Sequence, residues 1–347
     1  MSAEPGLLMT LESLRPWLAL PGLGLIVFAL LDLLTTSVMS GEGPLTRLIY
    51  RSACRALQRL SQGLGKRELL SWMAVWMVLG TFISWFTLTW AGWTLLFWSQ
   101  PGVVVWAGDD QVANLLDTAY FVGYTLTTLG LGDLHATAPG WRLATSLAAL
   151  NGFFLLTFAL TFLAPIASAH GERRLLSLRI FRAGPTPHDL ILTGLRDHPD
   201  GLAGVLHDLS GDLIQLDAKH KTALYLHCFY DPQAELDLHL QLTVLGEALL
   251  IMQHGLRDGP PEGLNAVRGS VQSLIRTHSK VHAPGHQPLP ALSLDPLRRA
   301  GVEVVDGADF QAALHAEAPF RRGLYDMTEG AGWPPERAVH GSSEGGG

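Results

Sequence analysis

The stretch "TTLGLGDL", residues 127–134, interrupts a long apolar part of the chain with two threonines, two glycines and one acid. The triplet Gly-Leu-Gly occurs three times, at residues 22–24, 63–65 and 130–132. Only the third follows a pair of threonines and precedes an acidic residue, Asp133. The glycine spacing alone decides nothing, so the sequence around this stretch has to indicate its role.

Charge divides the 347-residue chain into two unlike halves. Residues 1–170 hold 8 of the 24 Lys and Arg and 9 of the 31 Asp and Glu, while residues 171–347 hold the rest together with 12 of the 14 His. The first half is therefore typical of a membrane segment and the second of a water-soluble one. The net charge of −7 offers no basic face for nucleic acid, so no nucleic-acid partner is predicted.

Three stretches are long and apolar enough to cross a membrane, which takes roughly 20 helical residues. They run from Trp17 to Met39, from Leu69 to Trp98 and from Trp141 to Ala169. The first is too long, and has too few basic flanking residues, for a cleaved signal peptide. We therefore predict a multi-pass protein of the cell (inner) membrane.

The basic residues of the short loops predict the orientation. Six Lys or Arg lie between Ser40 and Glu68, and four Arg lie between residues 173 and 182, against single arginines at Arg15 and Arg142 on the other side. This bias predicts an N-terminus outside and a cytosolic C-terminal half. The expected segments are residues 1–16 outside, the first span at 17–39, a cytosolic basic linker at 40–68, a pore domain at 69–170, a second basic linker at 171–186, a helical cytosolic domain at 187–328 and a disordered tail at 329–347.

The first cytosolic loop has a regular pattern of its own. Its arginines recur every fourth residue and so share one face of a predicted helix, with apolar residues filling much of the remainder. Such a helix can lie along the anionic inner leaflet, either as an ordinary positive-inside anchor or as a lipid sensor. The predicted lipid-facing residues are Arg47, Arg51, Arg55 and Arg59.

Residues 112–134 lie between two spans of opposite direction, yet they are too apolar for an external loop and too short for two crossings. A short helix that enters the membrane and returns as extended chain satisfies both constraints. Non-helical backbone at that depth is tolerated where protein buries it or where it lines a water-filled path. A re-entrant hairpin that only packs remains an alternative at this point.

The run "DTAYFVGYTLTTLGLGDL", residues 117–134, resembles the pore helix and selectivity filter of tetrameric potassium channels, whose filter usually reads T-[TS]-V-G-Y-G-D. The resemblance covers residues 70–170. It implies a pore helix that includes Asp117 near its start, the aromatic pair Tyr120 and Phe121, and Tyr124 and Thr125. The matching filter positions are Thr127, Thr128, Leu129, Gly130, Leu131, Gly132 and Asp133.

The chemistry of potassium binding agrees with this pattern. A dehydrated K⁺ needs rings of oxygen atoms, which backbone carbonyls supply when successive residues turn them the same way. That backbone alternates into left-handed regions that glycine enters without steric cost, as at Gly130 and Gly132. The predicted helix from Asp117 to Thr127 also directs its negative C-terminal end at the filter. Asp117 is a candidate N-cap of that helix.

The resemblance also assigns the third span to an inner, pore-lining helix. Gly152 would be its hinge, or else a small residue for close packing, and Pro165 would bend its cytosolic end at a gate. Leu131 departs from the usual filter tyrosine, so the hydroxyl that would brace the filter is missing, and K⁺ selectivity stays open against a non-selective filter. The residues that would face the cavity are Phe153, Leu156, Thr161, Ala164 and Ser168.

One filter per chain implies that four chains form the ring, so the resemblance predicts a homotetramer. The first span carries no repeated arginines and is not a voltage sensor. Asp32 within that span is either paired with a basic side chain of the following loop or involved in ion passage.

The second half shows helical periodicity over residues 202–216, 236–252 and 264–275, with one strand-like stretch at 302–305. No glycine-rich nucleotide turn is visible, so the cytosolic ligand or partner is unknown. His278 and His282, with His286 beyond, offer only a weak metal pattern, because no Cys or acidic ligands accompany them.

The fold class predicted is an all-α membrane protein with three transmembrane helices, a re-entrant pore helix and filter, and a mostly α-helical cytosolic domain. The predicted function is a cation channel, potassium-selective or non-selective, with K⁺ at the filter carbonyls as permeant ion and no other cofactor or metal. The rival is a non-conducting receptor or scaffold on a pore fold. No catalytic constellation is visible, so no enzyme is predicted.

Overall fold

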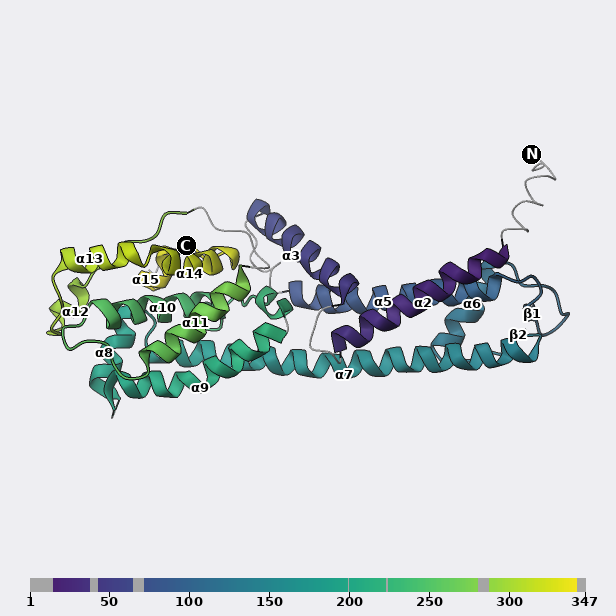
Figure 1. The fold of residues 1–347 in the computed structure, drawn as a ribbon, viewed down its shortest axis with the longest axis horizontal. Coiled ribbons are helices and arrows are strands. Elements are labelled where there is room, and N and C mark those ends of the chain that lie inside the picture. The colour runs from purple at the N-terminus through teal and green to yellow at the C-terminus, as the bar shows by residue number, and fades with distance from the viewer. Residues whose placement is uncertain are drawn as a thin grey trace, which may run out of the picture. The chain divides into compact units, whose positions relative to one another are not determined.

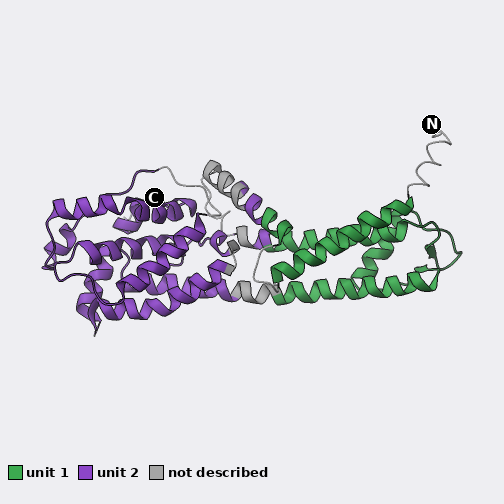
Figure 2. Cartoon of the chain, in the orientation of Figure 1, with its two compact units in different colours: residues 1–49, 78–165 green, residues 50–77, 166–347 purple. Residues whose placement is uncertain are grey.

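A computed structural model describes residues 15–37, 43–64, 72–198, 200–222, 224–279 and 287–341. The chain divides into two compact units (Figure 2). Unit 1 combines residues 1–49 with 78–165, and unit 2 combines residues 50–77 with 166–347.

Unit 1 is built on long apolar helices (Figure 1). Three helical stretches are long and apolar enough to span a membrane, at Arg15–Ser37, Val75–Trp98 and Pro139–Thr161, which confirms the three predicted spans. The elements are η1 (Arg15–Leu18), α2 (Ala19–Ser37), α3 (Pro44–Leu64), α5 (Met73–Trp98), β1 (Val104–Trp106), α6 (Leu115–Leu126), β2 (Leu134–Ala136) and α7 (Pro139–Ala183). Of these, α3, α5 and α7 continue along the chain into unit 2.

Helices α2 and α5 approach each other closely at a pair of glycines. A Cβ placed on Gly22 would lie 2.8 Å from the carbonyl oxygen of Gly92, and one placed on Gly92 would lie 2.7 Å from that of Gly22. Small residues at a crossing let two membrane helices pack backbone to backbone, where apolar side chains alone provide little attraction in lipid. The two glycines therefore fix where these helices cross.

A short two-stranded antiparallel sheet in unit 1 was not predicted. β1 pairs antiparallel with β2 in the register Val104 with Ala136, Val105 with His135 and Trp106 with Leu134. Three-residue strands give too little alternation to be recognised in a sequence. The pairing joins the chain after α5 to the chain after α6, so it holds together the two ends of the segment from residue 107 to residue 133.

Unit 2 is a bundle of helices around α10, whose residues Leu238–Met252 are all buried. α10 contacts α8, α11 and α14, and α9 packs along α11. A buried ion pair links α10 to α14, with Arg321 Nη2 2.8 Å from Glu247 Oε1. The elements are α8 (Pro187–Asp197), α9 (Gly201–Thr222), η2 (Leu224–Cys228), α10 (Leu238–His254), α11 (Leu264–His278), α12 (Asp295–Arg299), α13 (Gly307–Ala316), α14 (Ala318–Gly330) and α15 (Glu336–His340).

Three features of the second half differ from the predictions. The linker expected at residues 171–186 is mostly helix, because α7 continues to Ala183. The strand-like stretch at 302–305 forms only an isolated bridge between Val304 and Leu256. The tail expected to be disordered from residue 329 contains α15 and buries Trp333 and Val339 in the described part, because these apolar side chains have a bundle to pack against.

Candidate functional site

The helix that precedes the opening stretch, α6, begins with a complete capping box. Asn114 is the N-cap, and its side-chain oxygen accepts hydrogen bonds from Leu116 N at 2.8 Å and Asp117 N at 3.0 Å. Asp117 returns the interaction by accepting a hydrogen bond from Asn114 N at 3.0 Å. Asp117 is thus the third residue of the helix and not its N-cap, which corrects the prediction. Both residues satisfy backbone N–H groups that a helix start leaves unpaired.

The backbone after α6 alternates into left-handed conformations. Thr128, Gly130 and Gly132 have φ values of 58°, 56° and 81°. Left-handed backbone was predicted at the two glycines from the resemblance to a potassium-channel filter. Left-handed backbone was not predicted at Thr128. For this β-branched residue the left-handed conformation is sterically unfavourable, whereas for glycine it is not. Such alternation is the pattern that turns successive carbonyl groups toward the same side.

Two kinds of hydrogen bond hold this segment against α6. The backbone N–H of Leu129 donates to the Tyr124 carbonyl oxygen at 2.9 Å, and the hydroxyl of Thr127 donates to the Gly123 carbonyl oxygen at 3.0 Å. The segment from Thr127 to Gly132 is otherwise exposed in the single chain. Leu129 and Leu131, with exposed fractions of 65% and 52%, present apolar surface that one chain leaves uncovered.

Tyr124 links the helix to the far side of the same segment. Its hydroxyl donates to the Leu134 carbonyl oxygen at 2.8 Å in a buried setting. The Ala107 N–H, directly after β1, donates to the Asp133 carbonyl oxygen at 2.8 Å, so the two-stranded sheet also holds this end of the segment. Leu131 has no hydroxyl that could hold the segment by a hydrogen bond. The Tyr124 hydroxyl of α6 makes such a bond instead. Sequence reasoning placed Tyr124 on the helix but missed this contact, because the spacing of ten residues gives no local signal.

The aromatic residues of α6 face two environments. Phe121 is buried and lies edge-on to Phe97 of α5, with ring centroids 5.3 Å apart. Tyr120 is 44% exposed and lies edge-on to Tyr124 at 5.3 Å. Thr125 is buried, and its hydroxyl donates to the Phe121 carbonyl oxygen at 2.7 Å. The aromatic pair expected at 120 and 121 is thus split between an exposed and a buried face.

A hollow of about 600 Å³ lies beside the extended segment in unit 1. Its walls include Tyr124, Thr128, Gly130 and Gly132 on one side and Arg142 of α7 on another. The Arg142 guanidinium donates to the Ala136 carbonyl oxygen at 3.1 Å, which fixes it at the end of β2.

Gly152 of α7 contacts the end of α6 directly. A Cβ at this position would lie only 1.9 Å from the Leu126 carbonyl oxygen, so no other residue fits without displacing a helix. One residue earlier, Asn151 Oδ1 accepts a hydrogen bond from the Trp93 indole at 3.0 Å. The structure accounts for Gly152 by close packing, which was one of its two predicted roles.

The predicted cavity-lining residues of α7 are open in the single chain where the structure describes them. Phe153 and Leu156 are 56% and 53% exposed, and Thr161 and Ser168 are exposed as well. Pro165 and Ala164 lie within α7, but their side chains fall outside the described part of the structure.

Asp32 of α2 is buried at 1% exposure and serves as an acceptor for four donors. It accepts hydrogen bonds from Leu45 N at 2.8 Å, from Thr46 N at 3.3 Å and Thr46 Oγ1 at 2.7 Å, and from the Trp85 indole at 2.8 Å. The prediction of a basic partner is therefore wrong. The first N–H groups of α3 take that role because they are unpaired within their own helix.

The basic face of α3 is described in part. The helix extends over Pro44–Leu64, as the four-residue spacing of its arginines predicted, and Arg47 and Arg51 are exposed. The side chains of Arg55 and Arg59 lie outside the described residues.

Comparison with known proteins agrees with the geometry of this segment. Residues 71–168, which contain α5, α6 and the extended segment, match the family model described as "Ion channel". This match supports an ion-channel domain of the pore-loop type in a membrane protein.

A relative extends the comparison over most of the chain. The uncharacterized membrane protein YdjJ of Bacillus subtilis (strain 168) is 26% identical over 332 residues, which cover 93% of this chain and 96% of the relative. The similarity therefore includes unit 2 as well as residues 71–168, which match the family model. No solved structure matches the chain.

Proposed function

We propose that the chain forms a tetrameric, potassium-selective cation channel whose filter is the segment from Thr127 to Asp133. The observation that carries the proposal is the alternation of left-handed backbone at Thr128, Gly130 and Gly132 directly after the C-terminus of α6. A helix C-terminus carries partial negative charge, which favours a cation at that end. Carbonyl oxygens in this arrangement can replace the hydration shell of K⁺.

The proposal requires four chains. One segment supplies one oxygen to each ring, whereas a dehydrated potassium ion needs several, and cyclic symmetry provides four equal contributions. The exposed Leu129 and Leu131 and the hollow beside the segment support this assembly, because they leave apolar surface open in the single chain. Asp109, Asp110 and Asp133 would add negative charge at the outer mouth, which raises the local cation concentration.

Selectivity for potassium depends on how firmly the filter is held. Two hydrogen bonds support a filter of fixed width despite Leu131. One runs from the Tyr124 hydroxyl to the Leu134 carbonyl oxygen, and the other from the Ala107 N–H to the Asp133 carbonyl oxygen. We therefore favour potassium selectivity over a non-selective pore.

The basic residues of the short loops support an orientation in the membrane. We place the channel in the cell (inner) membrane with its N-terminus outside and unit 2 in the cytosol, because loops rich in Lys and Arg, such as those of α3 and of the end of α7, favour the cytosolic side. The exposed Arg47 and Arg51 would contact anionic lipid headgroups.

The first test is the reversal potential of the purified protein in a planar bilayer with KCl on one side and NaCl on the other. A value close to the potassium equilibrium potential supports the proposal. A clear current that reverses near zero makes the pore non-selective. Silence that persists after removal of the chain from residue 187 onward favours a non-conducting scaffold.

A matched pair of variants ties the current to the filter. Gly130→Ala forces a side chain into the left-handed backbone at φ 56°, which costs about 1–2 kcal/mol per chain, and should abolish the current while the tetramer persists. Gly24→Ala makes the same change on α2, where no heavy atom lies within 4 Å of the added Cβ, and should conduct as wild type. Equal currents from the two variants would contradict the assignment.

A further inference from the structure

Three buried histidines of unit 2 meet although they are distant in the sequence. His227 lies on η2, His239 is the second residue of α10, and His278 ends α11. Their exposed fractions are 2%, 1% and 2%. The sequence pattern pointed to His278, His282 and His286, but the latter two lie outside the described residues. The structure instead places His278 beside two histidines that the pattern did not connect to it.

The ring nitrogens of the three histidines converge. One nitrogen of each ring lies within 4.8 Å of one nitrogen of each of the others. The rings of His227 and His278 are edge-on at 5.5 Å between centroids, and those of His239 and His278 at 5.4 Å. A tetrahedral zinc ion with Zn–N bonds of 2.0–2.1 Å holds its nitrogens roughly 3.4 Å apart. Small ring rotations therefore bring the three nitrogens to metal-binding distance.

Burial keeps two of the three imidazoles, those of His227 and His239, in the form that binds metals. Desolvation lowers the pKa of both His227 and His239, so both are neutral near pH 7 and each keeps a lone pair. His227 Nε2 and His239 Nε2 have no hydrogen-bond partner among the described residues. Buried polar atoms are seldom left in that state in folded proteins. A metal ion would satisfy them.

Asp237 stands in the position of an outer-shell carboxylate. Its Oδ1 lies 3.5 Å from His239 Nδ1, and its side chain is fully buried. The carboxylate is fixed as the N-cap of α10, where it accepts hydrogen bonds from His239 N at 3.0 Å and Leu240 N at 3.2 Å. A carboxylate this close to Nδ1 favours a proton on that nitrogen, which would leave Nε2 of the same ring for a metal.

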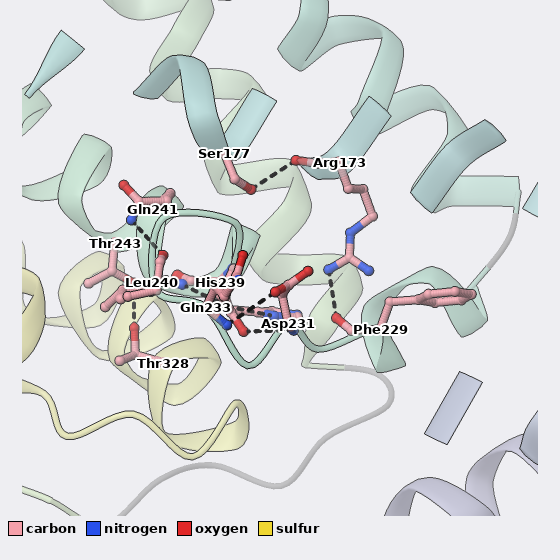
Figure 3. A network of polar contacts seen from close by, with 12 residues as sticks. Arg173, Ser177, Phe229, Asp231, Gln233, His239, Leu240, Gln241, Thr243 and Thr328 are labelled. Carbon is pink, nitrogen blue, oxygen red and sulfur yellow. Dashed lines mark hydrogen bonds and ion pairs between the residues drawn. The ribbon is translucent and has the colours of Figure 1, made fainter. Parts of the chain in front are cut away.

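The charges around the cluster decide whether a divalent cation is tolerated. Arg173 is buried and donates to the carbonyl oxygen of Leu226, next to His227. It also donates to the Phe229 carbonyl oxygen, as Figure 3 shows. Its positive charge opposes a second cation. Asp237 and Asp231 are also buried, and Asp231 lies 3.0 Å from Arg174. The two carboxylates therefore offset the charges of Arg173 and Arg174, so these four groups together carry no net positive charge.

We propose that His227, His239 and His278 form a binding site for a borderline transition-metal ion such as Zn²⁺ in unit 2. Imidazole nitrogens suit zinc, nickel and cobalt(II) and do not suit K⁺, Mg²⁺ or Ca²⁺, which prefer oxygen ligands. A fourth ligand completes the tetrahedron, either a water molecule or His220, whose ring centroid lies 4.5 Å from that of His227. The site is independent of the proposed channel function.

The test uses the full chain, purified in detergent with an affinity tag that contains no histidine. Mass-spectrometric metal analysis of protein from zinc-supplemented cells should find one zinc per chain. In a second experiment a chelator first removes the bound metal from the warmed protein. Co²⁺ added to this metal-free protein should then give the intense visible absorption of a tetrahedral site. Absence of both retained zinc and this absorption would overturn the proposal and leave the rings as buried packing residues.

Variants separate the site from the other histidines of the chain. His278→Asn should weaken zinc binding by about 100-fold or more, because it removes a direct ligand. His207→Gln removes an exposed histidine of α9 and should bind zinc as wild type. If His278→Asn does not fold, the cobalt absorption of the wild-type protein, competed by stoichiometric zinc, decides the matter. Equal zinc affinity in His278→Asn and His207→Gln would refute the assignment.

Discussion

Replacement of Asp32 should reduce the stability of the membrane part much more than any exposed residue of the same helix. The Asp32 side chain accepts four hydrogen bonds at 2.7–3.3 Å from Leu45, Thr46 and Trp85. In Asp32→Ala the Thr46 hydroxyl can turn elsewhere, but two backbone N–H groups and the Trp85 indole lose their acceptor. Each buried donor without an acceptor costs about 1–3 kcal/mol, so we expect a loss of about 4 kcal/mol.

A graded series separates this explanation from a general effect of substitution. Asp32→Asn keeps one acceptor oxygen, which can retain the contacts with Thr46 and Trp85, and turns an amide toward the Leu45 N–H. We expect a loss of about 1–2 kcal/mol, since one donor is left unpaired. Leu31→Ala changes the adjacent, 60% exposed residue and should alter stability by less than about 0.5 kcal/mol.

The assay is equilibrium unfolding by SDS in mixed micelles, followed by the fluorescence of the tryptophan-rich membrane helices. If Asp32→Ala lowers the free energy of unfolding by less than about 1 kcal/mol, the unpaired donors do not destabilise the protein as we expect. The same variants test the other predicted role of Asp32. If the acid only holds α2 to α3 and α5, the Asp32→Asn channels that fold should keep the wild-type unitary conductance, and a changed conductance would indicate a role in ion passage.

Three further changes probe other contacts. Gly152→Ala should prevent α7 from packing on α6, because its Cβ would lie 1.9 Å from the Leu126 carbonyl oxygen, and thermal unfolding in detergent should show the loss. Tyr124→Phe should cost about 1 kcal/mol by removing the bond to Leu134 and, in a conducting tetramer, lower the K⁺ over Na⁺ permeability ratio. Burial lowers the pKa of His220 to about 3, so chelated protein should lose stability below pH 6.5, where only the unfolded chain binds this proton, by about 2 kcal/mol at pH 5.

Each of these expectations has its own control. Gly171→Ala on the same helix adds a Cβ with no heavy atom within 4 Å, so it should be neutral or slightly stabilising. For Tyr124→Phe, an unchanged permeability ratio would show that the lost hydrogen bond does not set the filter width. For the pH dependence, a flat unfolding free energy between pH 7 and pH 5 would contradict the lowered pKa of His220.

The parts of the fold that could be predicted are those with a long or regular signal. Three spans follow from long apolar runs, and α3 follows from arginines at every fourth position. The left-handed backbone at Gly130 and Gly132 follows from the resemblance of residues 127–133 to a potassium-channel filter, in which glycine enters that region without steric cost. Each of these signals is contained in a single segment of the sequence.

The missed features depend on partners far along the chain. A basic partner was one of the two roles predicted for Asp32, because charge is visible in a sequence, whereas the unpaired N–H groups at the start of α3 are not. The hydrogen bond from Tyr124 to the Leu134 carbonyl oxygen depends on a two-stranded sheet whose strands have three residues each. The metal pattern searched for local spacing, whereas His227, His239 and His278 come from three elements separated by 12 and 39 residues. Helix packing, not periodicity, brings such groups together.

The two proposed cation sites differ in ligand chemistry, which allows each to be tested without the other. The filter offers uncharged carbonyl oxygens to a large, weakly hydrated ion, whereas the histidines offer nitrogen to a smaller divalent ion of intermediate softness. A chelator such as EDTA therefore removes zinc from unit 2 but cannot strip K⁺ from the filter. If chelation alters the open probability while the reversal potential stays constant, the histidine site regulates a filter that it does not form. A shift of the reversal potential on chelation would place the metal in the permeation path and contradict its assignment to unit 2.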